Sequence, residues 1–171
     1  MKIAIIYSLP TRRALSSPFV ATDEDTKDSA LEIAEALQSK NVEVIPVPVS
    51  EDTIAKIATI SADMIFNVLE WDGLDGTLLL DAMEIMHKTG IPYTGSSKEV
   101  LAVCNDKRRM KTSLDALGLP TPRWQEFVTG NEVVRDDFIY PVIVKLGLQH
   151  CSVGLTKDAV VTGKNKLLTV V

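Results

Sequence analysis

The chain has 171 residues, of which 46% are hydrophobic and 24% are charged, so it is long enough for one domain and part of a second. Its formal net charge of −5 makes it too acidic to coat nucleic acid. Its two cysteines, Cys104 and Cys151, have no CxxC spacing, which argues against a disulfide framework and against a zinc site. Because the N-terminal segment lacks a cleavage signal and no apolar run approaches the roughly 20 residues of a membrane helix, we expect a cytoplasmic protein without a membrane partner.

The first 50 residues contain two expected strands around one expected helix. Residues 2–7 form a continuous apolar run, which is typical of a strand covered on both faces. We interpret the long polar stretch at 8–25 as a functional or disordered loop. Asp25 or Thr26 is then expected to cap a helix that extends to about residue 40. A second strand is expected at 42–49, near a sheet edge, because its two prolines cannot donate ladder hydrogen bonds.

The same alternation continues to residue 117. The pattern predicts a short helix at 52–60, a strand at 63–69, a helix at 78–88 and a short strand at 91–94. Two further helices are expected at 98–103 and 106–117, the second closed by Gly118 and stopped by Pro120. This order predicts an α/β fold with a parallel, doubly wound sheet. In such sheets, ligands bind outside the carboxyl ends of the strands.

A change of composition at LGLPTP predicts a linker, with a first domain at 1–119 and a second unit at 120–171. The second unit has expected strands at about 124–129, 140–146 and 153–157, and a helix that begins near residue 165. A unit with so few strands has only a marginal hydrophobic core. We therefore expect this unit to be incomplete. Its exposed strand edge is expected either to be mobile or to pair with another copy in a homodimer, and proteolysis should leave a core that ends near Pro122.

Two segments, 92–122 and 140–154, combine a Thr/Gly/Ser turn, a cationic helix, a strand-end lysine and a glycine-bounded loop. Lys107, Lys145 and the backbone N–H groups beside the glycines could converge on a polyphosphate. Taken alone, however, NDKRRMK is also a charged helix face, and Lys145 a solvated lysine at a strand end.

The ordered motifs IPYTGS, NDKRRMK, LGLPTP, YPVIVK and SVG, with FNVLE and LDGT, resemble the D-alanine:D-alanine ligase family of the ATP-grasp superfamily. The resemblance implies a Rossmann-like pre-ATP-grasp domain followed by an incomplete α+β ATP-grasp subdomain. It also implies that the complete enzyme uses ATP and Mg²⁺ to convert a carboxylate to an acyl phosphate, which the amine of a second amino acid attacks, as in the synthesis of a peptidoglycan precursor dipeptide. The metal ligands are expected outside this chain, which by itself is expected to be inactive.

The resemblance also implies site residues. Lys107 and Lys145 would contact the nucleotide phosphates, and the loop at 147–154, with Ser152 and Gly154 retained, would close over them. Cys151 stands where the family has the first serine of this catalytic loop, and Gln149 and His150 replace the usual Glu and Gly. Alternatively, Cys151 is a small buried residue.

Two carboxylates are the candidates for the amino acid site. Glu24 lies near the position of the family's glutamate that binds the first substrate's ammonium group, although its acidic neighbours also suit a helix N-terminus. Glu70 stands where the family commonly has a histidine, and there it could bind the amino group of a substrate. Asp75 is expected to cap a helix. The altered positions leave two other readings open, a ligase for a different amino acid pair and a non-catalytic nucleotide-binding or interaction module.

Overall fold

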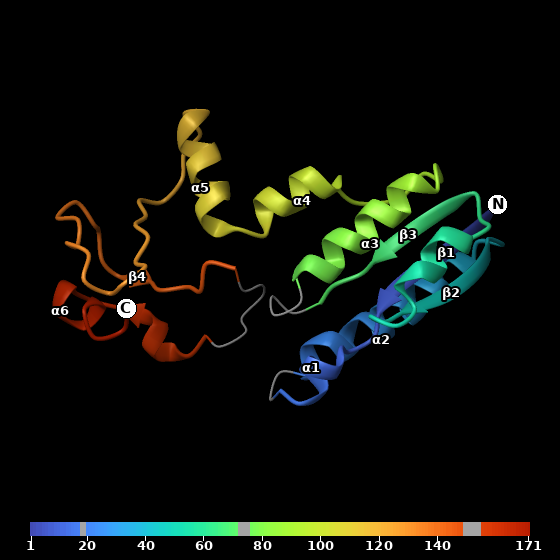
Figure 1. Ribbon diagram of the computed structural model, residues 1–171, viewed down its shortest axis with the longest axis horizontal. Helices are drawn as coiled ribbons and strands as arrows, with labels where there is room; N and C mark the ends of the chain where they lie inside the picture. The colour runs from blue at the N-terminus through green and yellow to red at the C-terminus, as the bar shows by residue number, and fades with distance from the viewer. Residues whose placement is uncertain (18–19, 72–75, 149–154) are drawn as a thin grey trace. The chain divides into compact units, whose positions relative to one another are not determined.

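The computed structural model describes residues 1–17, 20–71, 76–148 and 155–171, and Figure 1 gives the order of the helices and strands. The chain forms two compact units, Met1–Ala102 and Val103–Val171. The second unit therefore contains the LGLPTP segment and the helix before it. The domain division at residues 119 and 120 stays a prediction.

A three-stranded parallel sheet forms the centre of the first unit. Its order is β2–β1–β3, with β1 (Lys2–Ser8) between β2 (Glu43–Val49) and β3 (Met64–Val68). The three strands that the sequence predicted are thus present, and β2 with its two prolines lies at an edge of the sheet. The predicted fourth strand at 91–94 is reduced to an isolated parallel bridge between Tyr93 and Ile65.

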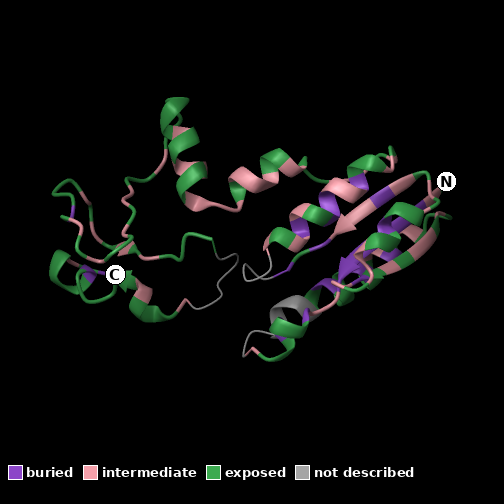
Figure 2. Ribbon diagram, viewed as in Figure 1, coloured by how far each residue is buried: buried purple, intermediate pink, exposed green. Residues whose placement is uncertain are grey.

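Both faces of this sheet are covered, because alternate side chains of β1 pack in opposite directions. Ala4 and Ile6 belong to a cluster with residues of α3 (Gly76–Lys88) and of the 3-10 helix η1 (Ile54–Thr59). The residues on the other face, Ile3, Ile5 and Tyr7, pack with Ala30 and Ala34 of α2 (Val20–Gln38). Figure 2 shows this burial along β1 and α3. The arrangement confirms the predicted doubly wound sheet.

The stretch at 8–25 is helical over much of its length and not the loop that its polarity suggested. Thr11 caps a short helix, α1 (Arg12–Leu15), by accepting a hydrogen bond of 3.1 Å from the amide of Ala14. Helix α2 begins at Val20, so the predicted caps Asp25 and Thr26 lie inside it. Thr26 is buried against β1, and this long-range packing allows a helix to form in a sequence with few apolar residues.

The second unit begins within α4 (Lys98–Cys104) and continues with α5 (Lys107–Ala116). After α5, Gly118 has φ = +66°, a left-handed conformation that favours glycine and ends the helix as predicted. A two-stranded antiparallel ribbon follows, formed by β4 (Val142–Ile143) and β5 (Val160–Val161).

The 3-10 helix η3 (Lys157–Ala159) lies between the two strands of this ribbon, and helix α6 (Lys164–Leu167) follows β5. Among the described residues of the second unit, the buried core is small and consists of Val134, Val161 and Leu167. None of the helices in the described ranges is both long enough and apolar enough to cross a membrane.

The strand predictions for the second unit were too generous. As the structure describes them, residues 124–129 form no strand, and the strand expected at 140–146 is only two residues long. The strand expected at 153–157 is absent from its described part, 155–157, and β5 lies further along. The amides of Val128 and Thr129 instead donate to the Glu132 carboxylate, so a side chain satisfies groups that a strand would direct to a neighbour.

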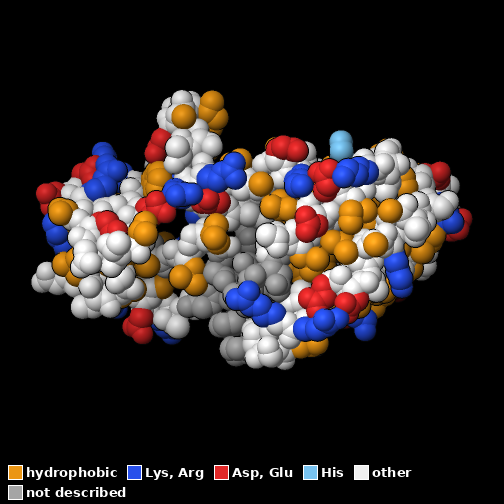
Figure 3. Space-filling model, in the orientation of Figure 1, with side chains coloured by type: hydrophobic (Ala, Val, Ile, Leu, Met, Phe, Trp, Pro, Cys, Tyr) orange, Lys and Arg blue, Asp and Glu red, His pale blue; other side chains and the backbone are white. Residues whose placement is uncertain are grey.

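Acidic and basic side chains are mixed on the surface, and several form ion pairs. Figure 3 shows this mixture on the face in view. Arg12, for example, pairs with Asp52 at 2.6 Å and with Glu51 at 3.2 Å. Exposed pairs of this kind contribute little to stability, so the apolar clusters hold the first unit together.

Candidate nucleotide and substrate site

The two lysines predicted to bind phosphate lie on segments that touch each other. Lys107 is the first residue of α5, and its amide donates a hydrogen bond of 3.0 Å to the carbonyl oxygen of Gly147. Gly147 lies two residues after Lys145, just beyond the end of β4. The tertiary structure therefore brings together the N-terminus of α5 and the start of the glycine-bounded loop.

The two lysine side chains differ in exposure. Lys145 is exposed, and within the described part of the chain its ammonium group has neither an ion pair nor a hydrogen bond. Lys107 is half-buried. An exposed ammonium group without a carboxylate partner can bind an anion without first breaking an existing contact.

The first turn of α5 is electropositive. It contains Lys107, Arg108 and Arg109 and no acidic residue. Its cap is Asp106, whose carboxylate accepts hydrogen bonds from the amides of Arg108 at 2.9 Å and Arg109 at 3.1 Å. The hydrogen bond from the Arg109 amide is the main reason why the pKa of Asp106 is lowered. The Asp106 carboxylate therefore already occupies two amides at this helix end, and Arg108 also pairs with Asp106 at 3.5 Å and with Glu126 at 3.8 Å. A phosphate at this turn would be bound by the basic side chains and not by the capped amides.

Glu70 lies at the carboxyl edge of the sheet in the first unit, directly after β3, and its side chain is exposed. Its backbone is held in place by Ser8 at the end of β1. The Glu70 amide donates to the Ser8 hydroxyl at 3.1 Å, and that hydroxyl donates to the Glu70 carbonyl oxygen. The structure thus places Glu70 at the strand end that the sequence predicted, and its role in binding stays a prediction.

Three buried residues that sequence reasoning did not single out support this edge: Ser8, Thr26 and Trp71. The Thr26 hydroxyl donates to the Ser8 carbonyl at 2.9 Å, and Trp71 Nε1 donates to the Leu9 carbonyl at 3.0 Å. The position of Ser8 at the end of an apolar strand was a usable signal. Thr26 was interpreted as a helix cap, so no sequence pattern indicated that it lies at this edge of the sheet.

Some predicted site residues lie outside the described residues, namely Cys151, Ser152, Gly154 and the helix cap Asp75. Glu24 was expected just ahead of the first helix, but it lies inside α2. Its side chain is outside the described part of the chain. Among the described residues, no group of three or more His, Cys, Asp or Glu could hold a metal ion.

Sequence comparison relates the chain to a family of ligases. A D-alanine--D-alanine ligase from Pseudomonas entomophila (strain L48) is 31% identical over 139 residues, which are 80% of this chain and 43% of that protein. A D-alanine--D-alanine ligase from Neisseria meningitidis serogroup C is 32% identical over 159 residues, 91% of this chain and 50% of that protein. By sequence, the chain is similar over most of its length to D-alanine--D-alanine ligases. It spans about half the length of these curated relatives, and no protein-family model matches it.

Solved structures show the same fold. A D-alanine--D-alanine ligase from Bacillus anthracis has a TM-score of 0.70 at 23% identity. The matched region is 99% of this chain and 52% of that ligase. The structure of a ligase from the same organism complexed with ATP has a TM-score of 0.67 at 22% identity. The VanG D-Ala:D-Ser ligase from Enterococcus faecalis has a TM-score of 0.62 at 19% identity. These likenesses confirm the predicted fold class, a doubly wound sheet followed by part of an ATP-grasp subdomain.

Proposed function

We propose that this chain is part of an ATP-dependent ligase that joins the carboxylate of one D-alanine to the amine of another. The observation that carries the proposal is the hydrogen bond between the Lys107 amide and the Gly147 carbonyl, because it joins the two segments with the phosphate-binding lysines. The similarity to D-alanine--D-alanine ligases, one of which, from Bacillus anthracis, is complexed with ATP, supports it.

In this proposal Lys107 and Lys145 hold the ATP phosphates, each through a charged hydrogen bond of roughly 1.5–3 kcal/mol. Bound ATP supplies the phosphoryl group that activates the carboxylate. The loop residues Cys151, Ser152 and Gly154 complete the phosphate site, and Mg²⁺ is held by ligands outside this chain. Positive groups on both sides of the phosphates would offset the charge that develops during phosphoryl transfer.

The proposed amino acid site lies on the first unit. Glu70 supplies an exposed carboxylate at the sheet edge for a substrate ammonium group, and Glu24 of α2 is proposed for the first substrate. The proposed setting is the cytoplasm, in the synthesis of a peptidoglycan precursor, with the chain as a homodimer and without nucleic-acid or membrane partners.

ATP titration of the 171-residue chain tests the nucleotide part of the proposal. Lys107→Met and Lys145→Met should each weaken ATP binding at least tenfold, because each removes one charged hydrogen bond. Lys166→Met is the matched control, since Lys166 is an exposed lysine of the same unit that pairs with Asp158. If the parent chain does not bind ATP, or if both variants bind it as well as the parent does, the proposal is wrong.

A ligase for a different amino acid pair is the second candidate. The observation that favours it is the exposed carboxylate of Glu70 at a position where the family commonly has a histidine. NMR titration of the chain with D-alanine and with D-serine separates the two candidates. Preference for D-alanine supports the first, and preference for D-serine the second. Glu70→Gln should weaken binding of either amino acid, whereas Glu35→Gln, an exposed control on α2, should not.

A further inference from the structure

Polar contacts hold helix α5 in the second unit, because the helix has no buried residue. Three of its side chains, Arg108, Lys111 and Asp115, have the spacing i, i+3 and i+7, which places them on one face. All three contact the segment at 121–126. This segment therefore lies against one face of the helix.

The contacts on this face differ in length. Asp115 Oδ2 accepts a hydrogen bond of 2.8 Å from Nε1 of Trp124. The Lys111 ammonium donates to the Thr121 hydroxyl and, at 3.3 Å, to the Pro122 carbonyl. The Arg108–Glu126 pair is longer, at 3.8 Å. The Trp124 contact has the most specific geometry, since indole has a single N–H donor.

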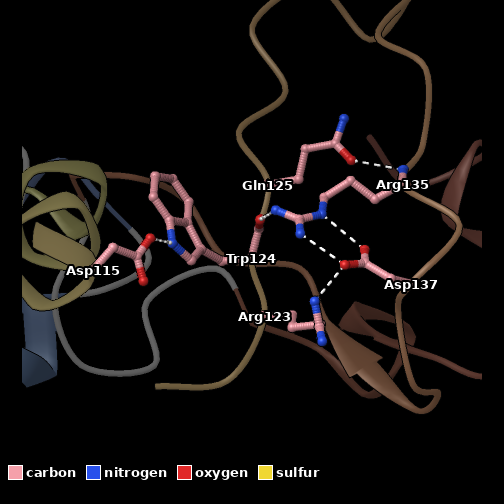
Figure 4. A network of polar contacts seen from close by, with 6 residues as sticks. All are labelled: Asp115, Arg123, Trp124, Gln125, Arg135 and Asp137. Carbon is pink, nitrogen blue, oxygen red and sulfur yellow. Dashed lines mark hydrogen bonds and ion pairs between the residues drawn. The ribbon is translucent and has the colours of Figure 1, made fainter. Parts of the chain in front are cut away.

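Trp124 is itself held from the other side by Arg135, as Figure 4 shows. The Arg135 guanidinium donates to the Trp124 carbonyl at 3.4 Å and makes two hydrogen bonds of 2.8 Å to Asp137, which Arg123 also contacts. The Arg135 amide donates to the Gln125 side chain at 3.0 Å. Arg135 thus contacts the Trp124 carbonyl and the neighbouring Gln125 side chain, while the Trp124 indole reaches α5.

We infer that Trp124 and Asp115 are a positioning pair that sets the place of Lys107. Asp115 lies eight residues after Lys107, a distance of about 12 Å along a rigid helix. Contacts near the two ends of α5, at Trp124 and at Gly147, together fix its direction. The inference rests on the proposed function, in which Lys107 binds ATP phosphate.

Backbone amide exchange tests whether the pair holds the helix. Trp124→Phe removes the N–H donor and keeps an aromatic ring, and Asp115→Ala removes the acceptor. Both should speed exchange of the Lys107 amide at least tenfold, because its bond to Gly147 opens more often. Asp115→Asn keeps an acceptor oxygen and should stay within about threefold of the parent. The Val144 amide, bonded to Ala159 at 2.9 Å, is the internal control and should not change.

ATP affinity then separates positioning from general stability. In the parent, Lys107→Met should lower ATP affinity at least tenfold. In the Trp124→Phe variant, the same substitution should lower ATP affinity less than about threefold, because Lys107 is already misplaced there. Lys145→Met should cost the same in both backgrounds, since Lys145 follows β4, which β5 holds. If Lys107→Met costs the same in both backgrounds, or if Lys107 exchange is unchanged, the positioning role is wrong. A parent chain that does not bind ATP would overturn the proposed function and this role with it.

Discussion

The hydroxyl of Thr26, inside α2, donates a hydrogen bond of 2.9 Å to the carbonyl oxygen of Ser8, the last residue of β1. Both residues are buried. The Ser8 hydroxyl in turn contacts the backbone of Glu70 after β3. Two small side chains therefore join a helix and two strands at the edge where Glu70 lies. Buried polar groups are costly to leave unpaired, so this edge depends on each of them.

Ser8→Ala should lower the free energy of unfolding by about 1–3 kcal/mol, because it removes the hydroxyl that accepts a hydrogen bond from the Glu70 amide and donates one to the Glu70 carbonyl oxygen. Thr26→Val should act in the same direction. Chemical denaturation of the 171-residue chain measures both effects. Ser39→Ala is the control, since its exposed hydroxyl bonds only to Ala36 of its own turn, and it should stay within about 0.5 kcal/mol of the parent. An equally small change for Ser8→Ala would show that the contacts at the edge are not needed.

Acid should open the turn at 128–132. Hydrogen bonds from the Thr129 and Val128 amides lower the pKa of Glu132 from 4.5 to about 2. A lowered pKa in the folded state means that the charged carboxylate stabilises the turn above about pH 4.5, and that this contribution is lost as the pH falls towards 2. Protection of the Thr129 amide from exchange, corrected for the intrinsic rate, should therefore fall over this range.

Glu132→Gln provides the matched comparison for this pH dependence. Its amide oxygen still accepts a hydrogen bond but does not titrate, so protection at Thr129 should be weaker at neutral pH and nearly constant between pH 4.5 and 2. Constant protection in the parent over the same range would contradict the role of the Glu132 charge.

The outer face of the β4–β5 ribbon should promote self-association. Ile143 and Val160 are paired directly across the two strands and are 51% and 43% exposed. An exposed apolar pair on a two-stranded ribbon can pack on a second copy. Sedimentation should show concentration-dependent association that Ile143→Thr and Val160→Thr reduce. Val128→Thr is the control, because Val128 is 78% exposed but lies outside the ribbon, and it should leave association unchanged. Monomeric behaviour of the parent at all concentrations would rule this surface out.

Limited proteolysis should cut the second unit first. The first unit contains two apolar clusters on opposite faces of its sheet, whereas among the described residues of the second unit only Val134, Val161 and Leu167 are buried. Early cleavage is expected at 129–171. Because α5 belongs to the second unit, the resistant fragment should end between residues 102 and 122, and mass spectrometry of the digest locates that end. Uniform protection along the whole chain would show that the second unit is as stable as the first.

Local sequence patterns were sufficient for much of the fold. The apolar run of β1 and the two prolines of the edge strand β2 each predicted a feature that the structure has, and the helix predicted at 78–88 is present as α3. Gly118 likewise marked the end of α5. These features act over a few residues, so the sequence alone contains the relevant interactions.

Only the tertiary structure decided which distant residues meet. The start of α2 was missed because its polar sequence is held by contacts with β1, and the predicted strand at 124–129 was wrong because Glu132 satisfies amides there. For the site, motifs identified Lys107 and Lys145 separately. Their proximity depends on the bond from the Lys107 amide to Gly147, forty residues further along the chain. Such a contact forms only after chain segments fold against each other, and no local pattern records it.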